Sequence, residues 1–396
     1  MSVFIKKAFN AAATTVRMIY PDLEENGRNE NIDPRPPKPA LLTDFQRLHI
    51  LGEGNFGSVY LVRNKWNDRV YAMKVTEKPT EEMEERHFKD EKRVLQNLKS
   101  QFLCEMHYFF QTNSKAYFVL DFFTGGDLFR FRLKVGTFSE DDARFYLAEV
   151  VLGVEYLHTH NVVHRDLKPE NLMIDIHGHV KIIDFGLCKV LRRGDKTNTF
   201  CGTLQFMAPE VVEEKNYDHS VDIWSLGAMT SELLTGRRLF GDKSESVVER
   251  KIVEGDFRLP WSISKKAKSL INRLLIIEPL NRATLEEIKM SDFFRAFSWE
   301  RIANKQVEPP FKPNVTDESD VSYFDKKLTE KAVEQSKYKT KIVEEKEKDT
   351  SAFFDFEAKP IRSSSVRYKK AAAESTSKVS CDLNNQSTRY ELRERK

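Results

Sequence analysis

The stretch from His164 to Asn171 reads HRDLKPEN and is the strongest signal in the sequence. Transfer of a phosphoryl group depends on positioning and charge neutralisation more than on covalent chemistry. We expect Asp166 to accept the hydrogen bond of an incoming hydroxyl and Lys168 to lie against a γ-phosphate. Asn171 offers a hard oxygen of the kind that Mg²⁺ prefers. The string therefore predicts a phosphoryl-transfer loop, because a chance polar loop with these residues is improbable.

A second motif, Asp-Phe-Gly at residues 184–186, begins thirteen positions after Asn171 and ends a strand pattern. Alone, such a triplet is often a turn. After the preceding loop, Asp184 becomes a candidate Mg²⁺ ligand between the β- and γ-phosphates. Met-Ala-Pro-Glu at 207–210 closes this segment, and we expect Glu210 to pair with Arg282.

Upstream, residues 52–59 read GEGNFGSV between two strand patterns. Glycines let backbone N–H groups approach phosphates without a Cβ clash. Such a run also fits a dinucleotide-binding loop or a tight turn, but a dinucleotide-binding loop opens a helix. Here SVYLVRN continues as a strand, which favours a flap over a nucleotide.

Lys74 closes an apolar strand pattern seventeen residues after Gly57. A lone lysine in a strand is otherwise an exposed edge charge, so an internal position requires a carboxylate partner. Glu91, in the charged helical segment 81–98, is the best candidate among several nearby glutamates. The pair would hold Lys74 toward the α- and β-phosphates.

Short β-rich runs begin at Phe45, and the sequence becomes mostly helical after residues 125–126. The pattern predicts an α+β fold with a small β-rich N-lobe and a larger helical C-lobe, joined by one crossing near 120–126. A short hairpin is expected over 172–183. The first 44 residues contain a polar, proline-rich linker, and their beginning is a docking helix or is disordered.

Composition limits the functional classes. The 396 residues are 40% hydrophobic with a formal net charge of +3, so a sizeable core is possible and no specific nucleic-acid binding is expected. The four cysteines form no CxxC pair, which favours a reducing compartment, and we expect the protein in the cytoplasm and also in the nucleus. No apolar run approaches the ~20 residues of a transmembrane helix. We also expect a monomer.

Three further stretches, at 184–189, 199–203 and 308–313, resemble the AGC group of protein serine/threonine kinases: DFGLCK, TFCGT and EPPFKP. HGHVKIIDFGLCK, SWERIANKQVEPPFKP and ESDVSYFDKKLT are most similar to its ribosomal S6 kinase branch, with the protein kinase B and C branches close. The resemblance implies a bilobal protein kinase fold and an active, non-specific protein serine/threonine kinase that uses ATP and Mg²⁺.

The resemblance also implies a domain organisation in which a C-terminal tail wraps the N-lobe. The implied parts are a flexible extension at 1–44, a catalytic domain at 45–297 with lobes at 45–123 and 124–297, an AGC-type tail at 298–357 and a basic disordered tail at 358–396.

For the nucleotide, the resemblance assigns the adenine to the backbone of Asp121 and Phe123, with Leu120 as gatekeeper and Asp127 near the ribose. The implied nucleotide-binding residues are Leu51, Gly52, Gly54, Phe56, Gly57, Val59, Ala72, Lys74, Leu120, Asp121, Phe123 and Asp127.

The resemblance further implies that an upstream kinase phosphorylates Thr199 in the activation segment. The phosphate would need cations to order the segment, and Arg165 and Lys189 match that role. His87 could link the phosphate to the helix that carries Glu91. Alternatively, His87 is a solvent-exposed helix residue without such a role.

Near the C-terminus, Phe353 and Phe356 resemble the group's hydrophobic motif, whose aromatics fill a groove on the small lobe. Glu357 stands where a phosphorylated Ser or Thr is usual and would supply part of that charge. Ala358 replaces an aromatic residue. The alternative is a small apolar patch in a low-complexity tail.

Glu170, Glu232 and Asp127 match family positions that hold substrate arginines, and Thr203 belongs to the same implied substrate site. We therefore expect protein substrates with Arg or Lys upstream of the acceptor. A pseudokinase-like scaffold acting through its tails is the alternative, but it predicts a damaged catalytic residue and all are intact. A small-molecule or lipid kinase fits less well, because Thr199 and the Ala-Pro-Glu segment favour a protein substrate.

Overall fold

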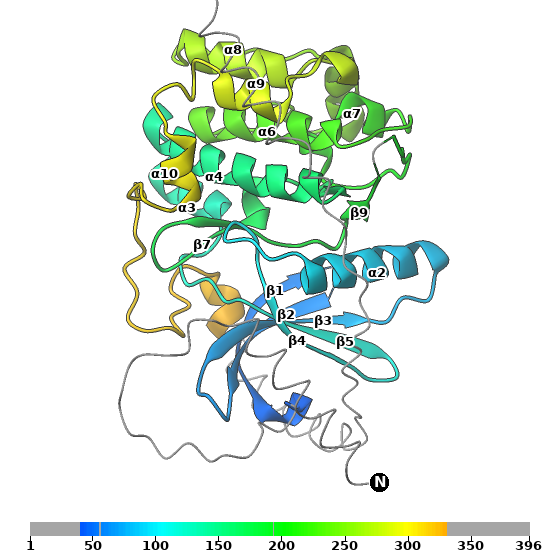
Figure 1. The fold of residues 1–396 in the computed structure, drawn as a ribbon, viewed down its shortest axis with the longest axis vertical. Helices are drawn as coiled ribbons and strands as arrows, with labels where there is room; N and C mark the ends of the chain where they lie inside the picture. Colours follow the sequence, from blue (N-terminus) through cyan, green and yellow to red (C-terminus); the bar gives the residue numbers. More distant parts are fainter. Residues whose placement is uncertain (1–39, 55–56, 193, 331–396) are drawn as a thin grey trace, which may run out of the picture. The chain divides into compact units, whose positions relative to one another are not determined.

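A five-stranded antiparallel sheet forms the N-lobe, with strand order β1-β2-β3-β5-β4 (Figure 1). This computed structural model describes residues 40–54, 57–192 and 194–330. The strands are β1 (Phe45–Gly54), β2 (Gly57–Asn64), β3 (Val70–Glu77), β4 (Met106–Gln111) and β5 (Lys115–Leu120). Aromatic and β-branched side chains of these runs pack on the pleated surface, which is why they form strands.

Helix α2 (Glu82–Asn97) packs against this sheet. Its first turn carries three glutamates, where the N-terminal end of the helix dipole favours acids. Phe88 packs edge-on against Phe118 of β5, with ring centroids 5.7 Å apart. Val94 and Glu91 are buried on the same helix. The burial of a glutamate beside apolar residues indicates that a cation lies opposite it.

The C-lobe is mostly helical. Its helices are α3 (Leu128–Val135), α4 (Glu140–Thr159), α5 (Pro209–Val212), α6 (Ser220–Thr235), α7 (Glu245–Glu254), α8 (Lys265–Leu274), α9 (Leu285–Met290) and α10 (Trp299–Ala303). Ser139 caps α4, since its side chain accepts a hydrogen bond from the backbone N–H of Asp142 at 3.1 Å. Helix α6 is buried on all sides, and α4 and α8 pack against it. Helix α6 is therefore the centre of the lobe (Figure 1).

Four short strands border the two motifs at 164–171 and 184–186. They are β6 (Val162–Val163), β7 (Leu172–Ile174), β8 (Val180–Ile182) and β9 (Lys189–Val190). Strands β7 and β8 form an antiparallel hairpin and β6 pairs with β9. These pairings fix both ends of the catalytic loop and both sides of the Asp-Phe-Gly triplet.

The segment after α10 runs from the C-lobe to the N-lobe. Phe311 stacks on Phe131 of α3, with centroids 4.2 Å apart, and Phe324 stacks on Phe122 at the crossing between the lobes, at 5.5 Å. Further on, the carbonyl of Thr329 lies 3.4 Å from a ring nitrogen of a β1 histidine. The described part of the tail thus contacts both lobes.

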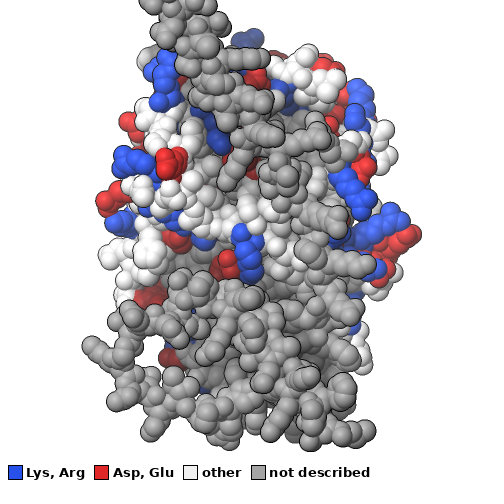
Figure 2. Space-filling view, in the orientation of Figure 1, with Lys and Arg blue, Asp and Glu red and all other residues white. Residues whose placement is uncertain are grey.

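The predicted α+β, two-lobed architecture is confirmed, including the 172–183 hairpin and the helix over 81–98. Phe56, the hydrophobic motif at 353–357 and the extension at 1–39 lie outside the described residues. On the face shown in Figure 2, basic and acidic side chains lie interspersed over the described surface. Within 40–54, 57–192 and 194–330, no helix has the length and apolar character needed to cross a bilayer.

Candidate active site

Lys74 of β3 lies at the centre of a buried charge cluster. Its Nζ is 2.7 Å from Oε1 of Glu91 on α2 and 3.0 Å from Oδ1 of Asp184. Burial lowers the pKa of the Lys74 ammonium, but the two carboxylates outweigh burial and hold that pKa well above its usual range. The predicted Lys74–Glu91 pair is confirmed, and it joins the sheet, α2 and the Asp-Phe-Gly triplet.

The catalytic loop places Asp166 in a closed hydrogen-bond network. Lys168 Nζ lies 2.7 Å from Oδ2 of Asp166, and Thr203 donates its hydroxyl to Oδ1 at 2.8 Å. Lys168 also donates to the Thr203 hydroxyl at 2.7 Å. The aspartate carboxylate therefore already accepts a hydrogen bond from an alcohol, which is the contact predicted for a substrate hydroxyl.

A buried carboxylate beneath the loop holds its backbone. Asp222 of α6 accepts hydrogen bonds from the backbone N–H groups of His164 and Arg165, each at 2.9 Å, and His158 Nε2 lies 2.8 Å from it. Burial raises the pKa of the Asp222 carboxyl, but the contact with His158 and the hydrogen bond from His164 lower that pKa by more, so the carboxyl stays charged. Arg165 has a φ of 68°, a strained backbone conformation that these bonds help to hold.

Asn171 and Asp184 are the candidate Mg²⁺ ligands. The side-chain amide of Asn171 donates to the carbonyl oxygen of Asp166 at 2.8 Å and to its carboxylate at 3.0 Å, which leaves the amide oxygen as an available ligand. Burial raises the pKa of Asp184, but Lys74 more than offsets it, so the carboxyl is ionised. No cluster of three or more His, Cys, Asp or Glu ligands occurs among the described residues. A pair of protein oxygens suits Mg²⁺, which takes its other ligands from phosphates and water.

The described residues of the glycine-rich run belong to the end of β1 and the start of β2. Leu51, Gly52 and Gly54 belong to β1, and Val59 of β2 pairs with Lys74 across the sheet. Gly57 has a φ of 115°, and a Cβ there would lie 2.0 Å from the carbonyl oxygen of Val75. Only glycine fits this close approach.

At the crossing between the lobes, Leu120 ends β5 and pairs with Ala72 of β3. The carboxylate of Asp121 accepts a hydrogen bond from the backbone of Glu105 at 2.9 Å, so the side chain holds this segment in place. Phe123 is buried. The predicted adenine contacts through this backbone stay predictions.

Thr199 lies half-buried near the predicted cations. Lys189 donates to the hydroxyl of Thr197 at 2.7 Å, and the Thr197 and Thr199 hydroxyls are 3.4 Å apart. Tyr217 donates to the Thr199 carbonyl at 2.7 Å and accepts from Arg165 at 3.1 Å. Sequence reasoning missed Thr197 and Tyr217, because neither belongs to a motif used to find the site.

His87 of α2 belongs to the same electropositive region. Burial lowers the pKa of its imidazole, and the charges of Arg165 and Lys189 lower it further. The half-buried side chain therefore differs from a solvent-exposed helix residue. Its predicted contact with a phosphate on Thr199 stays a prediction.

The three acids predicted to hold substrate arginines are each paired with an arginine of the chain itself. Arg238 contacts Glu170, Arg132 lies 3.3 Å from Glu232, and Arg130 lies 3.2 Å from Asp127. Sequence reasoning did not connect Arg238 with these acids.

The predicted Glu210–Arg282 pair is confirmed. Both nitrogens of the guanidinium fork contact the carboxylate, each at 2.6 Å, and both side chains are buried. This bidentate pair fixes the end of the activation segment to the loop before α9.

Two lobes, a lysine–glutamate pair between sheet and helix, and an aspartate–asparagine loop define a protein kinase domain. The family model for the protein kinase domain matches residues 45–294, and the chain belongs to this family.

Its relatives are kinases of the AGC group. Serine/threonine-protein kinase akt-1 of Caenorhabditis elegans is 43% identical over 301 residues, which cover 74% of this chain and 56% of that protein. Ribosomal protein S6 kinase beta of Caenorhabditis elegans is 41% identical over 298 residues, 72% of this chain and 54% of that protein. Serine/threonine-protein kinase Sgk1-A of Xenopus laevis is 39% identical over 339 residues, 80% of this chain and 78% of that protein.

The matched region thus spans about half the length of the first two relatives. The AGC resemblance is confirmed, and an S6 kinase is among the relatives.

Proposed function

We propose that the protein transfers the γ-phosphoryl group of MgATP to serine or threonine hydroxyls of proteins. One observation carries the proposal: Lys74 of the N-lobe forms a 3.0 Å ion pair with Asp184 of the C-lobe while Glu91 holds it from α2. In kinases, this lysine and this aspartate must both be in place around one nucleotide.

The residues of the chain divide the chemistry between them. Asp166 orients the acceptor hydroxyl and takes up its proton as the hydroxyl oxygen bonds to the γ-phosphorus. The bond from that phosphorus to the β–γ bridging oxygen breaks, and ADP leaves with that oxygen. Lys168, 2.7 Å from Asp166, neutralises charge on the transferred group. Mg²⁺, which Asn171 and Asp184 would hold, supplies further neutralisation when bound.

For substrates, we propose proteins with Arg or Lys upstream of the acceptor. Glu170, Glu232 and Asp127 support this proposal, because they gather acidic groups beside the catalytic loop and would orient a basic peptide. The paired arginines described above reduce this charge, so the preference depends on whether a substrate can displace them.

For regulation, we propose that an upstream kinase phosphorylates Thr199. The neighbouring cations Arg165 and Lys189 support it, since a phosphate adds nearly two negative charges and orders a segment by pairing with cations, and the imidazole of His87 lies in the same region. In the present arrangement Lys189 is held by Thr197. A phosphate on Thr199 would offer it a stronger partner.

The test is incorporation of labelled phosphate into a basic protein substrate by the full chain after treatment with an activation-loop kinase. We expect Asp184→Ala to lose activity by about 1,000-fold or more, since it removes a metal ligand, and Thr199→Ala to lose about 10- to 100-fold. Arg237→Ala, an exposed substitution, is the control. Equal labelling by wild type and Asp184→Ala would favour a scaffold, and full activity of Thr199→Ala would remove the regulatory proposal.

A further inference from the structure

Arg238, in the loop between α6 and α7, occupies the acidic site predicted to bind a substrate arginine. Its Nη2 contacts Oε1 of Glu170, and its Nε lies 3.8 Å from Oε2 of Glu232. Glu170 belongs to the catalytic loop and Glu232 to α6, so one guanidinium joins the two acids across this site.

Two aromatic rings complete the site around Arg238. The guanidinium carbon lies 4.9 Å from the ring centroid of Phe206 and 5.7 Å from that of Phe129. A cation over an aromatic face gains electrostatic attraction, most of all for arginine. Two carboxylates and two rings thus form a site with the chemistry of arginine recognition, and the chain supplies the arginine.

The contact with Glu232 is incomplete. This side chain is only 1% exposed, with Arg132 3.3 Å away on its other side. Neither carboxylate oxygen accepts a hydrogen bond from a described residue. Burial raises the pKa of Glu232, and the charges of Arg238 and Arg132 offset only part of that effect. The carboxylate therefore keeps hydrogen-bonding capacity that a better-placed guanidinium could use.

Asp127, the third acid, is less enclosed. Its partner Arg130 is 45% exposed and is shared with Asp325 of the tail, at 3.3 Å. An exposed, shared arginine is readily exchanged for another, since exposed ion pairs contribute little. The Glu170–Glu232 site differs, because a substrate cannot reach Glu232 unless Arg238 moves.

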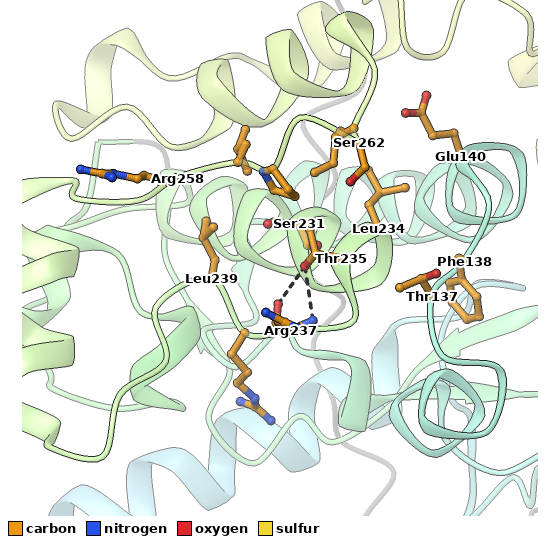
Figure 3. Close-up of a pocket in the computed structure, with 14 residues that line it drawn as sticks. Thr137, Phe138, Glu140, Ser231, Leu234, Thr235, Arg237, Leu239, Arg258 and Ser262 are labelled. Carbon is orange, nitrogen blue, oxygen red and sulfur yellow. Dashed lines mark hydrogen bonds between the residues drawn. The ribbon is translucent and has the colours of Figure 1, made fainter.

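Space for such a movement lies next to the loop. A pocket of about 770 Å³ is lined by Arg238 together with Leu239 of the same loop and Ser231 of α6. Figure 3 shows it between the end of α6, the start of α4 and the segment that carries Arg258 and Ser262. The lining includes none of the predicted nucleotide or metal residues.

We propose that Arg238 is an intramolecular competitor of substrate arginine that closes the Glu170–Glu232 site and so weakens selection for a basic residue at one substrate position. The inference rests on the proposed kinase function and specifies its substrate selection. Arg238 occupies the site in the free enzyme, and a substrate arginine binds there only by displacing it.

The test uses the activated full chain and synthetic peptides that differ by one arginine, placed in turn at each position upstream of the acceptor serine, with an all-alanine reference. We expect Arg238→Ala to raise kcat/KM about tenfold for arginine at one position and to leave the reference peptide unchanged. Arg237→Ala, the exposed neighbour, should give the wild-type profile.

Arg238→Gln is the second variant, which keeps a polar side chain but is shorter and uncharged, and it should show the same gain. Adding Glu170→Gln to Arg238→Ala should reduce the gain, because the opened site then lacks one of its two acids. Thermal melting of each variant confirms folding.

Two failures are distinguishable. If wild type selects arginine and both Arg238 variants show an unchanged profile, or a gain on every peptide, the inference is overturned while the proposed function stands. If no arginine at any position helps wild type or variants, the proposed substrate class fails as well.

Discussion

Two buried glutamates of the C-lobe, Glu210 and Glu232, both face arginines but differ in how completely their charges are met. Glu210 receives two hydrogen bonds of 2.6 Å from the guanidinium fork of Arg282. Glu232 has Arg132 at 3.3 Å and Arg238 at 3.8 Å, and accepts no hydrogen bond from the described part of the chain. Both glutamates face two positively charged nitrogen atoms, but only Glu210 has them at hydrogen-bonding distance and geometry.

Glu210 and Arg282 therefore form a structural ion pair, whereas the carboxylate of Glu232 can still accept hydrogen bonds from a ligand. A buried charge is tolerated at low cost when its hydrogen bonds are satisfied. Glu210 meets that condition within the chain. Glu232 does not, which is expected of a group whose best partner is an incoming ligand.

The largest expected effect concerns the ion pair between Glu210 and Arg282, whose hydrogen bonds are complete. Arg282→Ala leaves Glu210 charged and buried without its partner, so we expect the free energy of unfolding to fall by about 3–5 kcal/mol. Urea denaturation monitored by fluorescence measures it. Arg237→Ala, at an exposed position, should change it by less than ~0.5 kcal/mol. A loss below ~1 kcal/mol for Arg282→Ala would contradict the assignment of Glu210–Arg282 as a structural ion pair.

We expect the ionisation of Glu232 to make the free energy of unfolding depend on pH. The pKa of Glu232 in the folded protein lies above its ordinary 4.5, because burial outweighs the effects of Arg238 and Arg132. Between 4.5 and that raised pKa, the folded state binds a proton that the unfolded state has lost. The contribution of protonated Glu232 to the free energy of unfolding is therefore fully present below pH 4.5 and is lost as pH rises through the pKa of Glu232 in the folded protein.

We expect the unfolding free energy of Glu232→Gln to increase relative to that of wild type as pH rises through this window. Denaturation series at several pH values measure the difference. Two profiles that stay parallel would show that Glu232 is as well satisfied as Glu210.

The smallest effect concerns two serines of α6. The hydroxyl of Ser225 donates to the carbonyl of Phe206 at 2.9 Å, whereas the buried hydroxyl of Ser231 has no hydrogen-bond partner among the described residues. We expect Ser225→Ala to cost about 1 kcal/mol of stability and Ser231→Ala to be within ~0.5 kcal/mol of neutral. Equal costs for the two would contradict the distinction between satisfied and unsatisfied groups.

The lobes, the order of the elements and the pairs Lys74–Glu91 and Glu210–Arg282 were predictable from the sequence. Strand and helix patterns are local, and the motif residues have fixed partners because one nucleotide and one acceptor impose the same geometry on them.

The partners of the substrate acids were not predictable in the same way. Arg238 lies outside the motifs and reaches Glu170 across 68 residues of sequence, through a loop whose path depends on tertiary packing. Asp222 was likewise missed as the anchor of the catalytic loop, since its role appears only when α6 lies beneath residues 164–165.

The position of Asp222 also bears on how a movement between the two lobes would affect the loop at 164–171. The anchors described for the catalytic loop, Asp222, Tyr217 and Thr203, all belong to the C-lobe. If the site works as proposed, rotation of the small lobe would loosen or tighten the hold on a nucleotide and leave the Asp166 carboxylate in place for an acceptor hydroxyl. In that proposed cycle, release of the nucleotide would leave the arrangement of Asp166, Lys168 and Thr203 intact.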